Sequence, residues 1–304
     1  MQVKILGSAA GGGFPQWNCA CANCQAVRSG RFAGKSRLQT QVAISADGAS
    51  WFLLGASPDL RCQIESSPEL QPRGGSRSSP IEGVVLASSD LDHVLGLLLL
   101  REMHPFLVWG TESVLSTLRC QNTMFTMLNR VADQVRWNQI RSGESFGLKL
   151  INGESIGMTC ESRAVSERLP AYANRATAAD AVLGLVLTAT SGKKLGFFPQ
   201  IASLTTELKT LFASLDCLLL DGTFWSEDEL TRLQGTGQSA REMGHLPVGG
   251  ENGTLQQLAG LARPKKMYIH INNTNPMLNE AGPEFRAVRD AGWNLADEGC
   301  QFTL

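Results

Sequence analysis

The chain has 304 residues, of which 27 are basic and 28 acidic, so its net charge is −1 at pH 7. This length allows one large domain or two smaller ones, and 43% hydrophobic with only 18% charged residues indicates a compact folded body rather than a disordered chain. No basic stripe stands out, which argues against a nucleic-acid partner.

Short apolar segments predict strands along the chain, and helical patterns alternate with many of them. Runs such as LGLVL and CLLLD are typical of strands covered on both faces. We therefore expect one α/β domain over residues 1–304, with helices outside and sheet inside. The predicted strands are Val3–Leu6, Val42–Ile44, Trp51–Leu54, Ile81–Ala87, Phe106–Trp109, Leu183–Leu187, Leu195–Phe198, Leu218–Leu220 and Met267–Ile271, and the predicted helices are Val94–Met103, Glu112–Leu118, Ile201–Ser214 and Thr254–Leu261.

The opening segment and the apolar runs argue against export and membrane insertion. MQVKILGSAAGGGF is typical of a short strand that runs into glycines, without the charged start and long apolar run of a secretory signal. The longest aliphatic stretch, Leu95–Leu100, is far shorter than a membrane span. We expect a soluble cytoplasmic protein, in which the eight cysteines are thiols or metal ligands rather than disulfides.

Cys19, Cys21 and Cys24 form the motif CxCxxC within WNCACANC. Soft thiolates at this spacing suit a tetrahedral zinc ion, which would fix a segment that has few apolar residues to pack. The alternative is a set of reduced thiols in a glycine-rich turn, but the clustering favours a zinc knuckle at residues 19–24. The fourth ligand stays open between His104, His245, Asn273 and a residue of another subunit.

Two loop features lie between the predicted strands Trp51–Leu54 and Ile81–Ala87. SSPELQPRGGSRSSP, residues 66–80, is rich in Pro, Gly and Ser and predicts a flexible surface loop or lid. Just before it, Ser57-Pro58-Asp59 is typical of a helix start with proline at the first position, although Asp59 could instead face a metal.

Asp90, Asp92 and His93 lie in SSDLDHVLG, on the predicted turn between the strand Ile81–Ala87 and a helix. Open α/β sheets bind ligands at such carboxyl ends of strands. Asp92 has two interpretations, because a carboxylate at this position either caps the helix or binds a metal.

Two further predicted strands end in residues of the same kind. CLLLDGTFW ends its strand at Asp221, and MYIHINNTNP ends its strand at His270. A carboxylate that follows a run of aliphatic residues must be well hydrogen-bonded or bind a cation, because burying a bare charge is costly. Histidines and aspartates gathered at one sheet edge predict a divalent site for Zn, Mn or Fe, and two histidines with one carboxylate is the facial arrangement of non-haem iron.

The order of SSDLDH, DGTFW and IHINNTNP resembles the metallo-β-lactamase superfamily, whose signature turn reads HxHxDH. On this resemblance Asp92 and His93 match the end of the signature, Asp221 matches the bridging aspartate and His270 matches the last histidine.

This chain departs from the signature at three positions. Ser88 and Asp90 stand where the first two histidines would be, and AVSERLPAY contains no middle histidine, so Ser166 is taken for its position. These departures argue against ordinary two-zinc hydrolysis.

The segments SPDLRCQI, SSPIEGVVLASSDLDHVLGLLLLRE, FLVWGT, DGTFW, MGHLPVGG and YIHINNTNP together resemble the pyrroloquinoline quinone (PQQ) biosynthesis protein B family over nearly the whole chain. The resemblance implies a four-layer αββα sandwich, a structural zinc on CxCxxC, a variable active-site metal and a homodimer supported by the cysteine motif. In a related phosphodiesterase branch, a histidine three residues after the last motif histidine completes the structural zinc. Asn273 occupies that position here and is our preferred fourth ligand.

Two histidines lie outside the signature. A lone loop histidine such as His245 in EMGHLPVGG is usually only solvated, but superfamily members often place a glycine–histidine loop over the active site. The resemblance therefore implies a catalytic role for His245 as acid, base or substrate clamp. His104 precedes Pro105 at the end of a predicted helix, and we interpret it as structural.

Our first functional hypothesis is a metal-dependent oxygenase that acts on a precursor of PQQ. The family resemblance implies that this reaction hydroxylates a tyrosine-derived ring in a glutamate–tyrosine fragment. The reduced ligand set suits one Fe(II) with vacant positions for oxygen and substrate. Asp92, His93, Asp221 and His270 would hold this ion, and Asp90 could act as a further ligand.

Two other hypotheses belong to different classes. The lost histidines also fit a carrier that binds PQQ or its precursor on the way to the periplasm, although a chain without membrane spans cannot cross a bilayer alone. Metal-dependent hydrolysis requires a metal-bound water of lowered pKa, and the missing ligands disfavour it.

Overall fold

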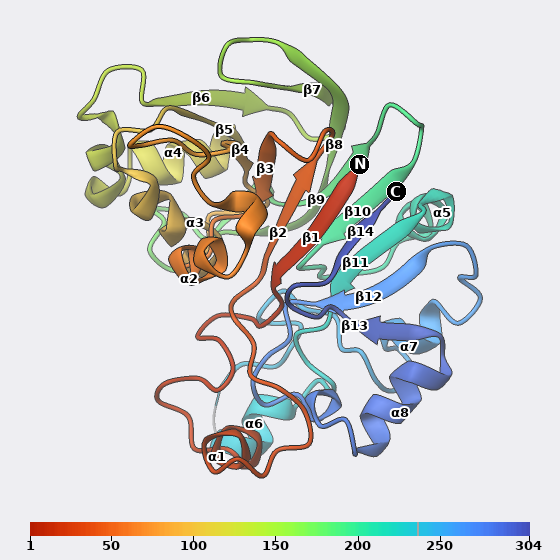
Figure 1. The fold of residues 1–304 in the computed structure, drawn as a ribbon. Helices are drawn as coiled ribbons and strands as arrows, with labels where there is room; N and C mark the ends of the chain where they lie inside the picture. The colour runs from red at the N-terminus through yellow and green to blue at the C-terminus, as the bar shows by residue number, and fades with distance from the viewer. Residues whose placement is uncertain (236) are drawn as a thin grey trace. The chain divides into compact units, whose positions relative to one another are not determined.

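The computed structural model describes residues 1–235 and 237–304, which form two compact units (Figure 1). Unit 1 comprises Met1–Leu6, Gln41–Lys194 and Gly299–Leu304, and unit 2 comprises Gly7–Thr40 and Leu195–Glu298. Each unit is thus assembled from segments that are distant in the sequence. Nowhere in the described ranges is a helix both long and apolar enough to traverse a bilayer.

Unit 1 contains a seven-stranded sheet in the order β14-β1-β2-β3-β4-β5-β6. The terminal strands β1 and β14 pair antiparallel, so that both chain ends lie at one edge of this sheet. Strands β3 to β6 run parallel to one another. The bounds are β1 (Gln2–Gly7), β2 (Gln41–Ser45), β3 (Trp51–Leu54), β4 (Ile81–Val85), β5 (Phe106–Thr111), β6 (Val135–Ile140) and β14 (Gln301–Thr303).

The helices of unit 1 cover this sheet and bury its central strands. All residues of β3 and β5 are buried, as expected for parallel strands packed on both faces. Figure 1 shows α2, α3 and α4 together on one side of these strands. The helices are α2 (Leu60–Glu65), α3 (Leu91–Val94), α4 (Glu112–Arg119) and the 3-10 helices η1 (Pro68–Leu70), η2 (Leu95–Leu100) and η3 (Thr123–Asn129).

An antiparallel meander completes unit 1. It consists of β7 (Ser145–Lys149), β8 (Ser155–Arg168) and β9 (Thr177–Thr188), with β8 between the other two. The backbone N–H of Leu183 in β9 donates to the carbonyl of Ala87, just after β4, at 2.7 Å. This bond ties the meander to the segment that carries the acid–histidine turn.

Unit 2 is built on parallel strands in the order β13-β12-β11-β10. The register pairs Asp221 with Ile269, so the residues that follow β11 and β12 emerge at one edge. The strands are β10 (Lys194–Phe198), β11 (Cys217–Asp221), β12 (Lys265–Ile269) and β13 (Trp293–Leu295), and the helices are α1 (Ala22–Arg28), α5 (Thr206–Ser214), α6 (Glu229–Gln234), α7 (Thr254–Gln257), α8 (Pro283–Asp290) and the 3-10 helix η4 (Pro276–Leu278).

All nine predicted strands are present, with shifts at their ends. The prediction for β3 has the observed bounds. The strands before the two polar turns end two residues earlier than predicted, at Val85 and Ile269, so the loops that carry the polar residues begin sooner. The predictions omitted most of the outer elements, including α1, α6, α8 and β6 to β8.

The predicted helices differ more from the structure. The segment 94–103 is mainly the 3-10 helix η2, which ends at Leu100, so His104 does not lie at a helix end. Gly96 packs directly on backbone here, since an added Cβ would lie 2.3 Å from the carbonyl oxygen of Ser57. The helix predicted at Pro58 begins at Leu60, after a turn in which the hydroxyl of Ser57 accepts from the N–H of Asp59.

Two further helices are shorter than predicted. α5 begins at Thr206 because Thr205 caps it by accepting from the N–H of Leu208. α7 ends at Gln257. Within residues 66–80 the structure contains η1 and then neither helix nor strand before β4 begins at Ile81.

Candidate metal centres

A buried acid–histidine cluster lies at the carboxyl ends of the parallel strands in unit 2. Asp221 is the last residue of β11 and is fully buried, and His270 follows β12 directly. His245, on the loop before α7, completes the group, and one ligand atom from each of the three residues lies within 4.8 Å of the others. The structure thus brings Asp221 and His270 together, and it places His245, for which the resemblance implied a catalytic role, beside them.

Hydrogen bonds account for the buried carboxylate of Asp221. Oδ1 accepts from the N–H and the hydroxyl of Thr223 at 3.0 and 2.7 Å, and Oδ2 accepts from the N–H of Ile201 at 3.0 Å. Nδ1 of His245 lies 2.9 Å from Oδ2. Burial opposes ionisation, but the contacts with His245, His270 and Thr223 hold the pKa of Asp221 below its usual range, so the carboxylate is an anion ready to bind a cation.

The two imidazoles of the cluster are held in a fixed orientation. The rings of His245 and His270 stack with centroids 5.4 Å apart and planes 18° apart, and Phe224 packs edge-on against His245. Nδ1 of His270 lies 2.8 Å from the hydroxyl of Thr223. His270 also has a positive φ of 58°, an uncommon backbone conformation for a non-glycine residue that turns the chain sharply after β12.

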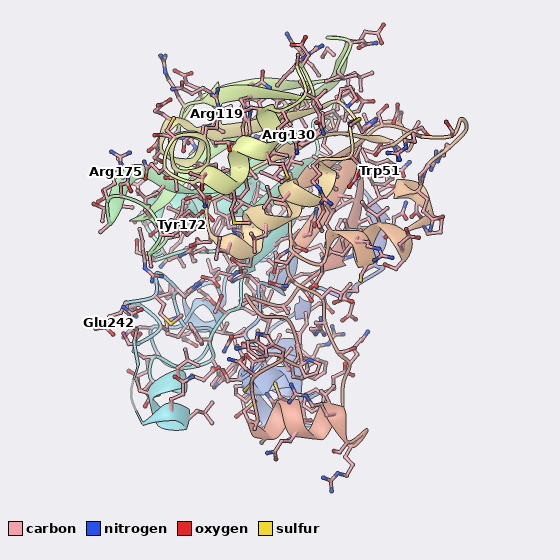
Figure 2. All side chains as sticks on the ribbon, turned by 90° about the vertical axis from the view of Figure 1, so that its left-hand side faces the viewer. Trp51, Arg119, Arg130, Tyr172, Arg175 and Glu242 are labelled. Carbon is pink, nitrogen blue, oxygen red and sulfur yellow. The ribbon has the colours of Figure 1, made fainter. Side chains whose placement is uncertain are left out.

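Unit 1 carries the second acid–histidine group on the turn between β4 and α3. The hydroxyl of Ser88 lies 3.0 Å from Nδ1 of His93 and 3.0 Å from Oδ2 of Asp90, and His93 is buried. Tyr172, which is labelled in Figure 2, lies on the loop between β8 and β9. Its hydroxyl donates to the carbonyl of Ser89. This contact ties the turn to the loop between β8 and β9.

The interpretation of Asp92 as the helix cap is wrong. The N-cap of α3 is Asp90, and Asp92 is the second residue of the helix, next to His93. A carboxylate in the first turn still complements the helix dipole, but it does not occupy the capping position.

The two units share one hydrogen-bonding pattern, in which a hydroxyl joins a histidine to an aspartate. In unit 1 the chain is His93, Ser88 and Asp90, and in unit 2 it is His270, Thr223 and Asp221. Because a hydroxyl that donates to a carboxylate can accept from an imidazole N–H, this network assigns the proton of each ring to Nδ1. With the proton on Nδ1, each ring has a free lone pair on Nε2, and Nε2 is therefore the nitrogen that can bind a metal.

The three cysteines of the knuckle converge in unit 2. The Sγ atoms of Cys19, Cys21 and Cys24 lie within 4.8 Å of one another, and Cys21 is the N-cap of α1. The side-chain amide of Asn273 lies 3.1, 3.7 and 3.3 Å from these sulfurs. A half-turn of this amide exchanges its nitrogen for its oxygen, so Asn273 is placed to offer an oxygen ligand.

The donor set of the knuckle fits zinc. Burial raises the pKa of the Cys24 thiol to about 11, so this thiol holds its proton at neutral pH unless a cation replaces it. Zinc lowers thiol pKa values and takes tetrahedral sulfur-rich sites.

Three other candidate residues lie outside these groups. Among the described residues, Asp59 and His104 belong to no cluster of three or more metal-ligating side chains. His104 lines a cavity of unit 1 beside the segment 66–80, and Ser166 lies in β8. The residue pattern around His245 did not predict its contact with Asp221 and His270, because His245 lies in a loop rather than at the end of a strand.

Comparisons with known proteins agree with this fold. The model of the Beta-lactamase superfamily domain matches residues 50–271, so the chain has a metallo-β-lactamase fold. A curated relative from Gluconobacter oxydans is 40% identical over 100% of this chain and 99% of its own length, and one from Nitrosococcus oceani is 39% identical over 100% of both chains. Both are called coenzyme PQQ synthesis protein B, and this chain belongs to that family.

A solved structure gives the same result. The crystal structure of Zn²⁺-bound PqqB from Methylobacterium extorquens is 37% identical, covers 100% of both chains and superimposes with a TM-score of 0.92. The expected metallo-β-lactamase-like αββα sandwich is therefore confirmed.

Proposed function

We propose that this chain acts in the synthesis of PQQ as a metal-dependent enzyme, and specifically as an iron-dependent hydroxylase of a tyrosine-derived precursor. The observation that carries the proposal is the buried cluster of Asp221, His245 and His270. Two imidazoles and one carboxylate suit Fe(II), and the same donors also accept Zn or Mn. The name of the curated relatives supports the pathway.

The ligand assignment follows from the hydrogen bonds. Nδ1 of His270 is engaged by Thr223 and Nδ1 of His245 by Asp221, so Nε2 is the nitrogen that each ring would offer to the ion. The motif order assigns Asp90, Asp92 and His93 to the active-site metal as well, and that assignment rests on the sequence. When bound, iron supplies the redox chemistry for inserting oxygen.

The chain's own residues then supply a buried negative charge and hold the ligands in place. Asp221 contributes a negative charge that burial strengthens, and Thr223 prevents rotation of both Asp221 and His270. His245 has two possible roles, as a third ligand or as the acid–base group of the earlier prediction. Metal analysis of His245→Gln separates them, because loss of the ion indicates a ligand and its retention without turnover indicates acid–base work.

The experiment uses anaerobic protein reconstituted with Fe(II), a glutamate–tyrosine fragment and ascorbate as a two-electron reductant, followed by exposure to air and mass spectrometry of the products. The reductant is needed because one oxygen atom of O₂ enters the ring and the other is reduced to water. We expect a hydroxylated fragment from the native chain and none from His270→Gln or from zinc-loaded protein. Intact iron loading without product contradicts the hydroxylase. Tight binding of finished PQQ without turnover of any precursor favours a carrier instead.

We also propose that the knuckle holds a structural zinc and supports a homodimer. The neighbouring Trp17 is 85% exposed, and a large aromatic side chain so exposed beside a rigid knuckle is suited to contact a second copy. Light scattering of the native protein and of Trp17→Ser tests this proposal. The variant dimer should dissociate at higher protein concentrations than the native dimer, and the variant should keep its zinc. A native monomer would contradict it.

A further inference from the structure

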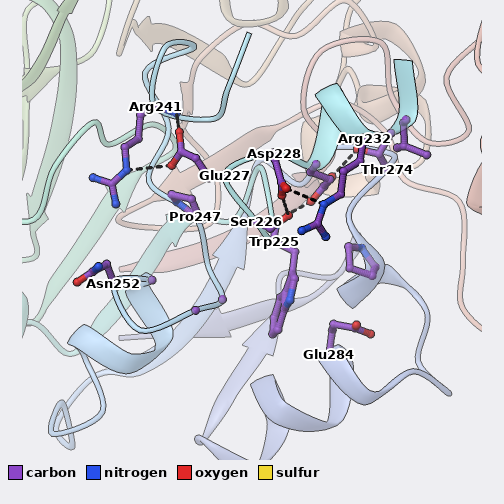
Figure 3. Close-up of a pocket in the computed structure, with 16 residues that line it drawn as sticks. Trp225, Ser226, Glu227, Asp228, Arg232, Arg241, Pro247, Asn252, Thr274 and Glu284 are labelled. Carbon is purple, nitrogen blue, oxygen red and sulfur yellow. Dashed lines mark hydrogen bonds and ion pairs between the residues drawn. The ribbon is translucent and has the colours of Figure 1, made fainter. Parts of the chain in front are cut away.

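Unit 2 contains a cavity of 1210 Å³ that none of the candidate metal ligands lines (Figure 3). Its wall comes from the loop after β11, helix α6, the loop residues 241 and 247–253, the start of η4 with the segment before it, and the first turn of α8. A cavity of this size accommodates a small molecule or a side chain of a peptide.

An indole ring is fixed in the wall of this cavity. The backbone of Trp225 donates to the buried carboxylate of Glu229 at 2.6 Å, and its carbonyl accepts from the N–H of Gly249 at 2.9 Å. The ring packs on Gly249 so closely that an added Cβ there would lie 2.6 Å from its Cε2 atom. Glycine at this position therefore lets the backbone support the indole.

The charges of the wall leave an excess of carboxylate. Arg232 pairs with Asp228 at 2.6 Å and Arg241 with Glu227 at 2.9 Å, so both guanidinium groups are already neutralised. Two more acidic residues, Glu229 and Glu284, line the same cavity, and neither forms an ion pair within the part of the chain that the structure describes.

These two remaining carboxylates differ in their surroundings. Glu229 is 7% exposed and accepts from the hydroxyl of Thr274 and from the backbone of Trp225. Glu284, in the first turn of α8, has neither a hydrogen bond nor an ion pair among the residues that the structure describes. In the view of Figure 3, Trp225 lies between the Asp228–Arg232 pair and Glu284.

We propose that this cavity binds an organic cation, whose charged group lies against the indole of Trp225 and pairs with Glu284. The favoured source is an arginine side chain of a short peptide, because a planar guanidinium can stack on an indole and still pair with a carboxylate. A free polyamine offers related chemistry. No candidate metal ligand lines this cavity, so the proposal does not rest on the proposed metal chemistry.

Calorimetry of the full chain with its metals tests the proposal. The probes are an acetylated glycine–arginine–glycine amide, the same peptide with citrulline, which keeps the shape and removes the charge, and spermidine. We expect saturable binding of the arginine peptide and at least about tenfold weaker binding of the citrulline peptide. Binding of spermidine alone would keep the cation site and assign it to polyamines.

Variants localise the binding. Glu284→Gln should weaken it about threefold to fivefold and Trp225→Leu about threefold to tenfold. The matched controls Glu280→Gln and Trp137→Phe, which alter similar groups outside the cavity, should leave it unchanged. Equal affinity for arginine and citrulline peptides, an effect of Glu284→Gln no larger than that of Glu280→Gln, or no binding of any probe up to about 10 mM would each overturn the proposal.

Discussion

The hydroxyl of Thr223 lies 2.8 Å from Nδ1 of His270 and at the same time hydrogen-bonds to the carboxylate of Asp221 at 2.7 Å. This single oxygen orients both a candidate imidazole ligand and a candidate carboxylate ligand. Partners of this kind fix the tautomer and the direction of a metal ligand, so their loss weakens metal binding even though they do not touch the ion.

Thr223→Val should therefore lower the affinity of the acid–histidine cluster for its metal by about 10-fold to 100-fold. It should also destabilise the fold by about 1–3 kcal/mol, because the buried carboxylate loses a donor. Metal titration and urea unfolding measure the two effects. Thr223→Ser keeps the hydroxyl and should restore most of the affinity, and equal affinities of the Val and Ser variants would contradict this role.

Asp221→Asn removes the negative charge but keeps nearly the same shape. The amide would present N–H groups to the donors that now reach the carboxylate, so we expect about 1–3 kcal/mol of destabilisation and loss of the metal from this cluster. The knuckle zinc should stay bound. Metal analysis checks this, with the exposed-pair variant Asp228→Asn as control, and retention of the cluster metal in Asp221→Asn would rule out a ligand role.

Cys21→Ser should release the knuckle zinc while the acid–histidine cluster keeps its metal, because the two groups share no ligand. Asn273→Ala should weaken zinc binding less, since three thiolates remain. Competition with a chromogenic chelator measures the order of release. Unchanged zinc content in Cys21→Ser would remove the knuckle as a metal site.

The buried carboxyl group of Glu229 should make the free energy of unfolding depend on pH. Burial raises its pKa to about 7, above the ordinary value of 4.5, so the folded state binds its proton more tightly than the unfolded chain. Its contribution to stability is full below pH 4.5 and is lost as pH rises through about 7, with a slope of at most about 1.4 kcal/mol per pH unit. Glu229→Gln should flatten this slope in urea unfolding, whereas Glu280→Gln should leave it unchanged.

Tyr172 supports the acid–histidine turn of unit 1 through its bond to the carbonyl of Ser89. Tyr172→Phe should cost about 0.5–1.5 kcal/mol of stability and lower turnover of the precursor by disturbing the neighbouring Asp90. Tyr268→Phe is a matched control, because it removes a hydroxyl that bonds to Thr254 in unit 2, away from that turn. Equal losses of turnover in both variants would indicate general destabilisation.

The strands that position the candidate site could be predicted because their signals are local. Trp51–Leu54 and Cys217–Asp221 are short runs of buried residues, and Asp221 and His270 follow such runs directly. Helix ends were predicted less well. The segment after His93 has a helical pattern, but residues Leu95–Leu100 form a 3-10 helix. In this helix Gly96 packs on the backbone of Ser57, which is distant in the sequence.

The sequence by itself determined the family, the cysteine knuckle and the residues Asp92, His93, Asp221 and His270 as candidate ligands, since these depend on spacing and strand ends. Only the tertiary structure decided that His245 lies against Asp221 and His270. Its loop is held by backbone bonds from His245 to Ala240 and from Leu246 to Ile201, which no local pattern encodes. The same holds for the hydroxyls of Ser88 and Thr223, because a side chain's partners depend on segments that meet only after folding.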